Sequence, residues 1–415
     1  MLKAILQNYK SSILLVIALA IGGFIGMTFP SIAKEVKPIG EIFLNLLFMT
    51  IVPLVGVSVM SSIAKMTDLR KLGKILLLVI IISLLMPLVA SLTMIGLHEI
   101  YNPAKGIIVT FEQSFEGNAG GMNFVEMVTA SDFIGLLSKK NILALIIMSI
   151  IGGIAIGQAG ESGQKISSLL DAANDVIMKL ISIIMKLAPL GLGCYFADTM
   201  ASQDPKLVIT FGSVIAMFFV TSLVYFIFAS TFYSWIAGGL PAIKSFWKYM
   251  MEPAATSLGT CSSLASLPVT IRAAKKMGLN DDIVNVSLPL LANLNKGGVA
   301  MIATLKVLFI YQILGIPFDT QALLLTLMIA VISAIIVGGV PGGAFLGEIF
   351  IVTTLGLPLE AIPMLVILGA ITDAPATMLN VVNDLNATQI IQRFCGNKKP
   401  AGKDTPPINQ LATDV

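Results

Sequence analysis

Three long stretches of this sequence carry no charged residue. Residues 42–64, 75–97 and 207–243 contain neither Asp, Glu, Lys nor Arg. A helix needs about 20 apolar residues to cross the hydrocarbon core of a bilayer, so each stretch is long enough to span one. Charged residues make up only 12% of the chain, against about 25% in soluble domains. The sequence therefore predicts an all-α integral membrane protein surrounded by lipid.

The distribution of basic residues predicts how the chain is oriented in the cell membrane. Residues 65–74 hold four Lys or Arg against one Asp, whereas the interior of residues 99–132 is acidic. Basic loops stay in the cytoplasm, so we expect residues 65–74 and both termini on that side, and residues 99–132 outside. The first six spans are expected at residues 11–33, 42–64, 75–97, 141–160, 165–200 and 207–238.

The sequence offers little support for an enzyme or for a nucleic-acid partner. It contains one histidine, three scattered cysteines, and no phosphate-binding or dinucleotide-binding motif. Ser262 and Ser263 are conceivable nucleophiles, but the Gly-x-Ser-x-Gly elbow is absent. No basic run alternates with aromatic residues, as nucleic-acid binding would require. We therefore expect no catalytic residue and no resident cofactor.

Two apolar segments in the second half are interrupted by polar or helix-breaking residues. Residues 253–271 (PAATSLGTCSSLASLPVTI) are rich in Ser, Thr, Gly and Ala, and residues 329–347 contain GGVPGG. Irregular backbone at membrane depth survives only inside protein or along a water-filled cavity. We interpret both segments as hairpins of two half-helices; kinked spans with tolerated small residues are the alternative. Such a pair of interrupted segments is typical of a transporter binding site.

The last span carries polar residues on one helix face. Asp373, Thr377, Asn380 and Asp384 are spaced by four, three and four residues, which places them on one side of a helix at about 100° per residue. Ionisable residues inside a membrane are expensive and therefore functional candidates. Asp373 is suited to a substrate ammonium, and Asp384 with Asn380 to a hard cation through oxygen ligands.

The region from about residue 250 to 393 resembles the dicarboxylate/amino acid:cation symporters, the family of glutamate-transporter homologues. The resemblance is carried by CSSLASLPVT (261–270), NLNKGG (293–298), GGVPGG (338–343) and DAPATMLNVVND (373–384), with KLAPLGL (186–192) upstream. Each motif alone is weak, but their order and spacing together are specific.

This resemblance implies eight transmembrane helices, two re-entrant hairpins, a homotrimer and an elevator mechanism, in which a transport domain moves against a scaffold. The implied segments are scaffold helices 1–2 (1–72), transport helix 3 with an outer loop (73–140), scaffold helices 4–5 (141–205), transport helix 6 (206–243), hairpin 1 (244–276), helix 7 (277–316), hairpin 2 (317–359), helix 8 (360–395) and a cytoplasmic tail (396–415).

The resemblance also places the substrate between the hairpin tips, beside the eighth helix, with Asp373 matching the residue that holds a substrate amine. In members with acidic substrates an arginine contacts the side-chain carboxylate, but its two positions here are Ala376 and Cys261. We therefore predict an amino acid with an uncharged side chain. The implied substrate residues are Ser262, Ser263, Val340, Pro341, Gly342, Asp373, Ala376, Thr377 and Asn380.

The ion-binding motif of the family is altered. Its seventh span carries Asn-Met-Asp-Gly, and the matching residues here are Asn295-Lys296-Gly297-Gly298. One sodium site is therefore expected to be lost, whereas another remains possible at Asn295, Asn380 and Asp384. Lys296 is expected either to replace a sodium ion by its fixed charge or to carry a proton, because a buried ammonium loses its proton more readily, with Glu348 as its partner.

Other interpretations remain open at this point. Lys296 is compatible with ordinary sodium symport around it, or with an ammonium that reaches an aqueous vestibule and couples to nothing. The alternative function is a sodium-coupled symporter of acidic amino acids or dicarboxylates. An uncoupled channel is more remote, because charged rings and repeated carbonyl filters are absent.

Overall fold

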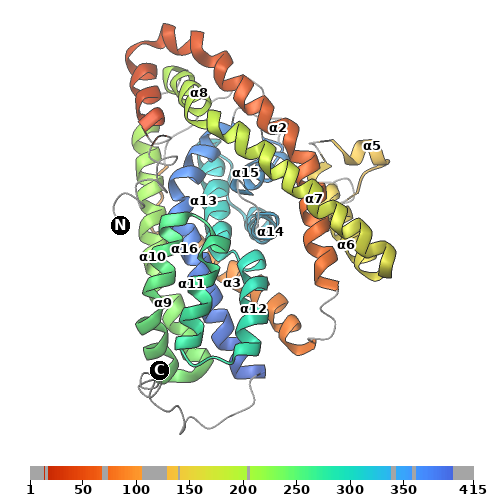
Figure 1. The fold of residues 1–415 in the computed structure, drawn as a ribbon. Coiled ribbons are helices and arrows are strands. Elements are labelled where there is room, and N and C mark those ends of the chain that lie inside the picture. The colour runs from red at the N-terminus through yellow and green to blue at the C-terminus, as the bar shows by residue number, and fades with distance from the viewer. Residues whose placement is uncertain are drawn as a thin grey trace, which may run out of the picture.

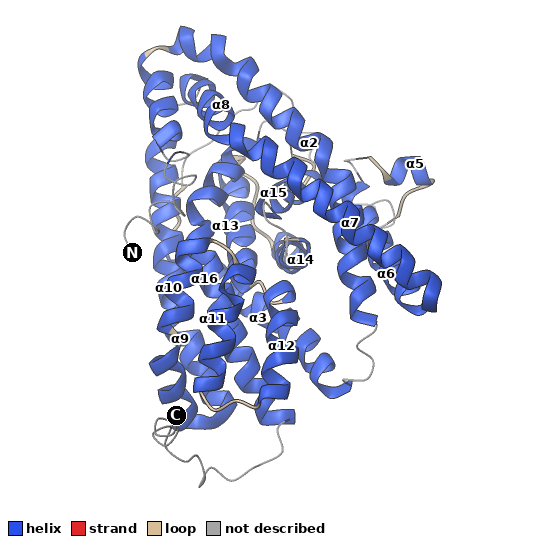
Figure 2. Ribbon diagram, viewed as in Figure 1, coloured by secondary structure: helices blue, strands red, loops and turns tan. Residues whose placement is uncertain are grey.

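The computed structural model describes residues 14, 17–67, 73–104, 129–138, 141–202, 206–337, 343–357 and 361–395, and these residues include no β-strand (Figure 2). Five helical stretches among them are long and apolar enough to cross a membrane: Gly73–Ile100, Gly160–Ala201, Thr210–Tyr249, Asp281–Ile313 and Met364–Cys395. This agrees with the predicted all-α membrane protein. The count of eight spans and two re-entrant hairpins stays a prediction.

A first group of helices is assembled around α2 (Pro30–Thr67), the long diagonal helix of Figure 1. The helices packed against it are α6 (Ile142–Gln158), α7 (Gly160–Ile184) and α8 (Ala188–Ser202). Glycine permits the close approach of α8 to α2, since a Cβ on Gly191 would lie 2.4 Å from the Cβ of Phe43. A side chain at that position would force the two helices apart.

A second group surrounds α16 (Ile362–Cys395), which runs through its middle in Figure 1. Every residue from 379 to 391 is buried, so this helix is a core element in spite of its polar residues. The helices that contact it are α3 (Gly73–Ile100), α9 (Lys206–Tyr249), α10 (Met251–Thr260), α11 (Ser263–Lys276), α12 (Asp281–Leu294), α13 (Gly297–Ile313) and α15 (Gly343–Thr354). The two groups meet through limited contacts, chiefly of α8 with α16 and of α6 with α15.

The chain breaks between α10 and α11, where the sequence predicts the tip of the first hairpin. Cys261 takes a left-handed backbone conformation with φ of 47°, which is uncommon for a residue other than glycine. Ser262 then caps α11, because its hydroxyl accepts a hydrogen bond of 3.2 Å from the backbone N–H of Ala265. The two short helices pack against each other.

A second break separates α12 from α13 at Asn295 and Lys296, the polar residues inside NLNKGG. The second predicted hairpin contains α14 (Thr320–Ile336) and α15, which pack together. Its predicted tip, residues 338–342, lies outside the described residues.

Several element boundaries differ from the predicted spans. The second predicted span begins at residue 42, whereas α2 already begins at Pro30. The sixth ends at residue 238, and the helical backbone of α9 is interrupted there, at Gly238 and Gly239, before it continues to Tyr249. Gly239 has φ of 66°, a conformation that favours glycine. Short elements are α5 (Phe133–Leu136) and η3 (Met185–Leu187).

Candidate functional site

The break between α12 and α13 brings the first turn of α13 against α16 in the second helix group. Gly298, in the first turn of α13, donates its backbone N–H to the side-chain oxygen of Asn380 on α16 at 2.8 Å. A Cβ on Gly298 would lie 2.1 Å from the carbonyl oxygen of Ala376. Only glycine therefore allows α13 to begin this close to α16.

Lys296 is the residue that joins the two breaks. Its side chain is buried, with 5% of the residue exposed. The ammonium nitrogen donates to the hydroxyl of Ser263 at 2.9 Å and to the carbonyl oxygen of Ala292. Lys296 is therefore enclosed by protein in this structure, and it ties the start of α11 to the end of α12.

Carboxylates surround this lysine. Asp373 and Asp384, both on α16, interact electrostatically with Lys296. Asp384 also accepts a hydrogen bond of 3.2 Å from the side-chain amide of Asn295. One positive charge therefore lies near two negative charges in a buried region, where charge interactions are strong.

The oxygen atoms beside Lys296 partly match the sodium site that the sequence predicts. The side-chain oxygen of Asn295 is buried and has no hydrogen-bond partner among the described residues. Together with the Asp384 carboxylate it offers the oxygen ligands that a hard cation prefers. The third expected ligand is engaged elsewhere, because the side-chain oxygen of Asn380 accepts from Gly298. The described residues contain no cluster of three or more His, Cys, Asp or Glu that would hold a metal.

Glu348 does not pair with Lys296, and our prediction of that pair is wrong. It forms a buried ion pair with Lys306 of α13 instead. The two side chains are 1% and 4% exposed. Gly369 of α16 provides the space, since a Cβ there would lie 2.5 Å from the carboxylate of Glu348 and 2.7 Å from the ammonium of Lys306.

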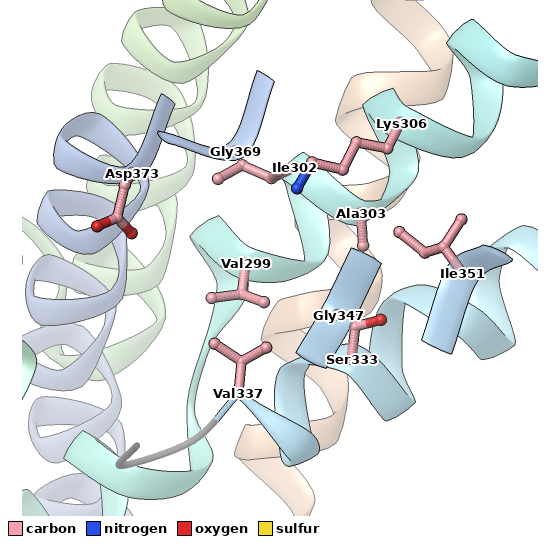
Figure 3. A pocket seen from close by; sticks show the side chains of 10 residues that line it. All are labelled: Val299, Ile302, Ala303, Lys306, Ser333, Val337, Gly347, Ile351, Gly369 and Asp373. Atoms are coloured by element: carbon pink, nitrogen blue, oxygen red, sulfur yellow. The ribbon is translucent and has the colours of Figure 1, made fainter. Parts of the chain in front are cut away.

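A small cavity of about 30 Å³ adjoins this ion pair. That volume has room for about two water molecules. Figure 3 shows Asp373 and Lys306 reaching the cavity from α16 and α13, with Gly369 between them. The lining residues are Val299, Ile302, Ala303, Lys306, Ser333, Val337, Gly347, Ile351, Gly369 and Asp373. The wall is therefore mostly apolar, with one charged residue of each sign.

Asp373 connects this cavity to the first break. Its carboxylate accepts a hydrogen bond from the side chain of Thr377, one turn further along α16, and interacts electrostatically with Lys306 and Lys296. It also interacts electrostatically with Cys261, at the turn between α10 and α11. The carboxylate of Asp373 is therefore near enough to interact electrostatically with both lysines and with the first hairpin tip.

The remaining predicted substrate residues have varied surroundings. Ser263 binds Lys296, Ser262 caps α11, and Ala376 is buried beneath Gly298. Thr377 and Asn380 engage Asp373 and Gly298 as described above. The predicted residues of the second tip lie outside the described residues: Val340, Pro341 and Gly342. Substrate contacts for all of these residues stay predictions.

Lys306 is the residue that sequence reasoning missed. It stands ten positions after Lys296 in an otherwise apolar stretch of α13. That isolation was the available signal, because an ionisable residue within a membrane span is a candidate for function. Its partner was not predictable, since Glu348 is 42 residues away in the chain.

Comparison with known sequences gives one family match and several full-length relatives. The profile described as the sodium:dicarboxylate symporter family matches residues 12–394. A C4-dicarboxylate transport protein of Aeromonas salmonicida is 27% identical, with 91% of each chain covered. Proteins with the same name from Rhizobium etli and Caulobacter vibrioides are 26% and 24% identical; the matches cover 92% of this chain and 85% and 94% of those proteins.

Proposed function

The chain belongs to the sodium:dicarboxylate symporter family, and from this premise we propose that it carries small dicarboxylates across the cell membrane. It is a secondary transporter and a multi-pass membrane protein, and it is not an enzyme. These points confirm the predicted family and class. Our first prediction, an amino acid with an uncharged side chain, finds no support in the relatives, which agree better with the dicarboxylate alternative.

The observation that carries this proposal is the position of Lys306. The neutral substrate was inferred because Ala376 and Cys261 replace the arginines that would contact a carboxylate. Lys306 brings a positive charge from α13 into the cavity that Asp373 also lines. An ammonium is a suitable partner for a carboxylate, although it lacks the planar two-point geometry of arginine. The absence of arginine therefore no longer argues against an acidic substrate.

Asp373 favours an acidic amino acid as a second candidate substrate. A carboxylate at the wall of the cavity repels a substrate carboxylate and attracts an ammonium. An acidic amino acid has two carboxylates and one ammonium, so it suits both Lys306 and Asp373. A plain C4 dicarboxylate suits Lys306 alone, unless Asp373 carries a proton.

We further propose that Lys296 acts as a fixed positive charge at a site where relatives hold a mobile cation. Its two neighbouring aspartates support this role, because both attract a positive charge. The carboxylate of Asp384 and the unpaired oxygen of Asn295 leave room for one sodium ion as a co-substrate. Coupling to a proton at Lys296 is the competing hypothesis.

We also propose a homotrimer, cytoplasmic termini and an elevator mechanism. Movement of one domain against another is supported by the limited contacts between the group around α2 and the group around α16. All the candidate residues described above lie in the group around α16. We therefore propose that this group is the transport domain and that the group around α2 is the scaffold.

Uptake into proteoliposomes tests the proposed function. With an inward sodium gradient we expect succinate or aspartate to accumulate above its outside concentration, and serine not to accumulate. Accumulation of serine without either dicarboxylate would restore the neutral substrate. Uptake that stops at equal concentrations would indicate an uncoupled pore. Comparison of succinate with aspartate decides whether an amino group is required.

A further inference from the structure

The ion pair of Lys306 and Glu348 is placed where a structural role alone explains it poorly. Both side chains are buried among apolar residues of α13, α14 and α15. Removing two charges from water costs several kcal/mol per ion, and apolar residues of similar volume often stabilise as well or better. A buried pair of this kind is therefore weak evidence for stability and a candidate for function.

The two partners are not equivalent in their surroundings. Lys306 lines the cavity, whereas Glu348 is not among its lining residues. The carboxylate of Glu348 therefore binds the ammonium without being part of the cavity wall. An ammonium has three hydrogen-bond donors, and Glu348 is the acceptor found for Lys306 among the described residues. Lys306 therefore retains capacity to bind another acceptor on the cavity side.

Glu348 itself is incompletely bonded. Its second carboxylate oxygen is buried and has no hydrogen-bond partner among the described residues. Leaving such an atom unsatisfied costs about 1–3 kcal/mol, and more when it is charged. The missing hydrogen bond of Glu348 therefore costs free energy, and a new partner or protonation of the carboxylate would relieve this cost.

We propose that Lys306 receives one carboxylate of the substrate, and that Glu348 is the internal counter-ion whose place this carboxylate takes. The inference rests on the proposed transport of dicarboxylates. It assigns Lys306 as the residue that distinguishes a substrate with two carboxylates from a substrate with one. A cavity with room for about two water molecules is too small for a whole four-carbon acid, so substrate entry requires its walls to separate. Val337, the last residue described before the second tip, is part of that wall.

This replacement of Glu348 by the substrate carboxylate, called the exchange below, also changes the charge of Glu348. When the substrate carboxylate pairs with Lys306, Glu348 loses its partner in apolar surroundings. It then accepts a proton from the bulk solvent, conducted by the water that enters with the substrate, so one proton accompanies each substrate molecule whose carboxylate binds Lys306. The charged groups that face Glu348 are Lys306 on α13 and Asp373 on α16. The other helices that contact α15, α6 and α14, contain no Asp, Glu, Lys, Arg or His.

The test compares two ligands that differ only in one charge. Succinamate is succinate with one carboxylate replaced by a neutral amide, and asparagine relates to aspartate in the same way. Whichever of the two pairs contains the transported dicarboxylate is used. In that pair we expect the wild-type protein to bind the dicarboxylate about tenfold to a hundredfold more tightly than the amide, the effect of one hydrogen bond between charged groups. In Lys306→Met/Glu348→Gln, which removes both charges together, this preference should fall close to one. Because it is a ratio within one sample, the amount of folded protein cancels.

Glu348→Gln alone keeps the ammonium and serves as the matched variant. It should retain at least the wild-type preference, and the pH dependence of dicarboxylate uptake should flatten because the proton-accepting group is gone. An unchanged preference in the double variant, or a lost preference in Glu348→Gln, would overturn the role of Lys306. An unchanged pH profile in Glu348→Gln would overturn the exchange. If wild type binds neither dicarboxylate, it is the proposed function that fails instead.

Discussion

At the scale of single residues, charge compensation decides where polar groups lie in this membrane protein. Lys296 is bonded to Ser263 and Ala292 and faces two aspartates. Lys306 faces Glu348 and Asp373. Buried charges are tolerated when they are paired and hydrogen-bonded. Each lysine therefore balances part of the negative charge of the carboxylates around it.

Lys296→Met tests this compensation. Removing one member of a buried charge cluster costs about 3–5 kcal/mol, so we expect a lower midpoint of thermal unfolding in detergent. Sodium should restore more stability to this variant than to wild type, because Asp373 and Asp384 then need a mobile cation. Lys296→Met/Asp384→Asn, which also removes a negative charge, should recover part of the loss. The same sodium response in variant and wild type would contradict the idea of a fixed charge.

Cys261 provides a second test at this scale. Its thiol lies near Asp373 at the turn between α10 and α11, so a bulky thiol reagent there should block uptake. A transported dicarboxylate should slow the reaction, because Asp373 is near the thiol and also lines the cavity proposed to bind the substrate. Cys261→Ser should be active and resistant to the reagent, although Cys194 and Cys395 are still present. Inhibition of Cys261→Ser at the wild-type rate would place the sensitive thiol elsewhere.

At the scale of helices, glycine positions determine how closely the polar faces approach. Gly298 contacts the backbone of α16 at Ala376, whereas Gly369 faces only the ends of two flexible side chains. Backbone cannot yield without moving a helix, but side-chain ends can turn aside. Gly298 therefore maintains the short distance between α13 and α16, whereas Gly369 maintains the geometry of the ion pair.

Alanine substitutions separate these two roles. Gly298→Ala should destabilise the protein by about 1–3 kcal/mol, the range for overpacking. Gly369→Ala should cost less stability and instead weaken dicarboxylate binding through displacement of Lys306 and Glu348. Gly96→Ala in α3 is the control, because a Cβ there meets nothing within 4 Å and alanine favours helix. Thermal unfolding and uptake affinity measure both effects; equal stability of all three variants would contradict the close contact.

At the scale of the whole molecule, the two helix groups are joined by few contacts. One group holds the charged residues of the candidate site and the helix breaks at Cys261 and at Asn295 and Lys296, and the other is packed around α2. This division supports movement of one group against the other. Contacts between domains that slide are expected to be small, since large apolar interfaces resist relative motion.

A covalent tether between the groups tests that movement. In a variant without the three native cysteines, one cysteine on α6 and one on the facing turn of α15 should form a disulfide when their Cα atoms are within about 7 Å. Oxidation should abolish uptake, reduction should restore it, and dicarboxylate binding should persist. A pair within one group, on α14 and α15, is the control. Full uptake by the tethered protein would reject the elevator proposal.

The amino-acid sequence alone determined the features that depend on local chemistry. Charge-free runs indicated membrane helices, the polar stretch of residues 253–271 indicated the break between α10 and α11, and the spacing of Asp373 to Asp384 placed polar groups on one face of α16. These patterns follow from helix periodicity and from the cost of polar groups in lipid. The break at Asn295 and Lys296 was not predicted, since the sequence indicated one continuous helix 7.

Only the tertiary structure decided which charges meet. Lys306 pairs with Glu348 across 42 residues of sequence, and Ser263 binds Lys296 across 33. Contacts of this kind have no local signature, because they depend on how separate helices pack. The sequence therefore suggested Lys296 as the partner of Glu348 and overlooked the lysine that shares a cavity wall with Asp373. That residue supports the proposed dicarboxylate substrate, since a buried ammonium gives an acidic group a partner that the sequence motifs lacked.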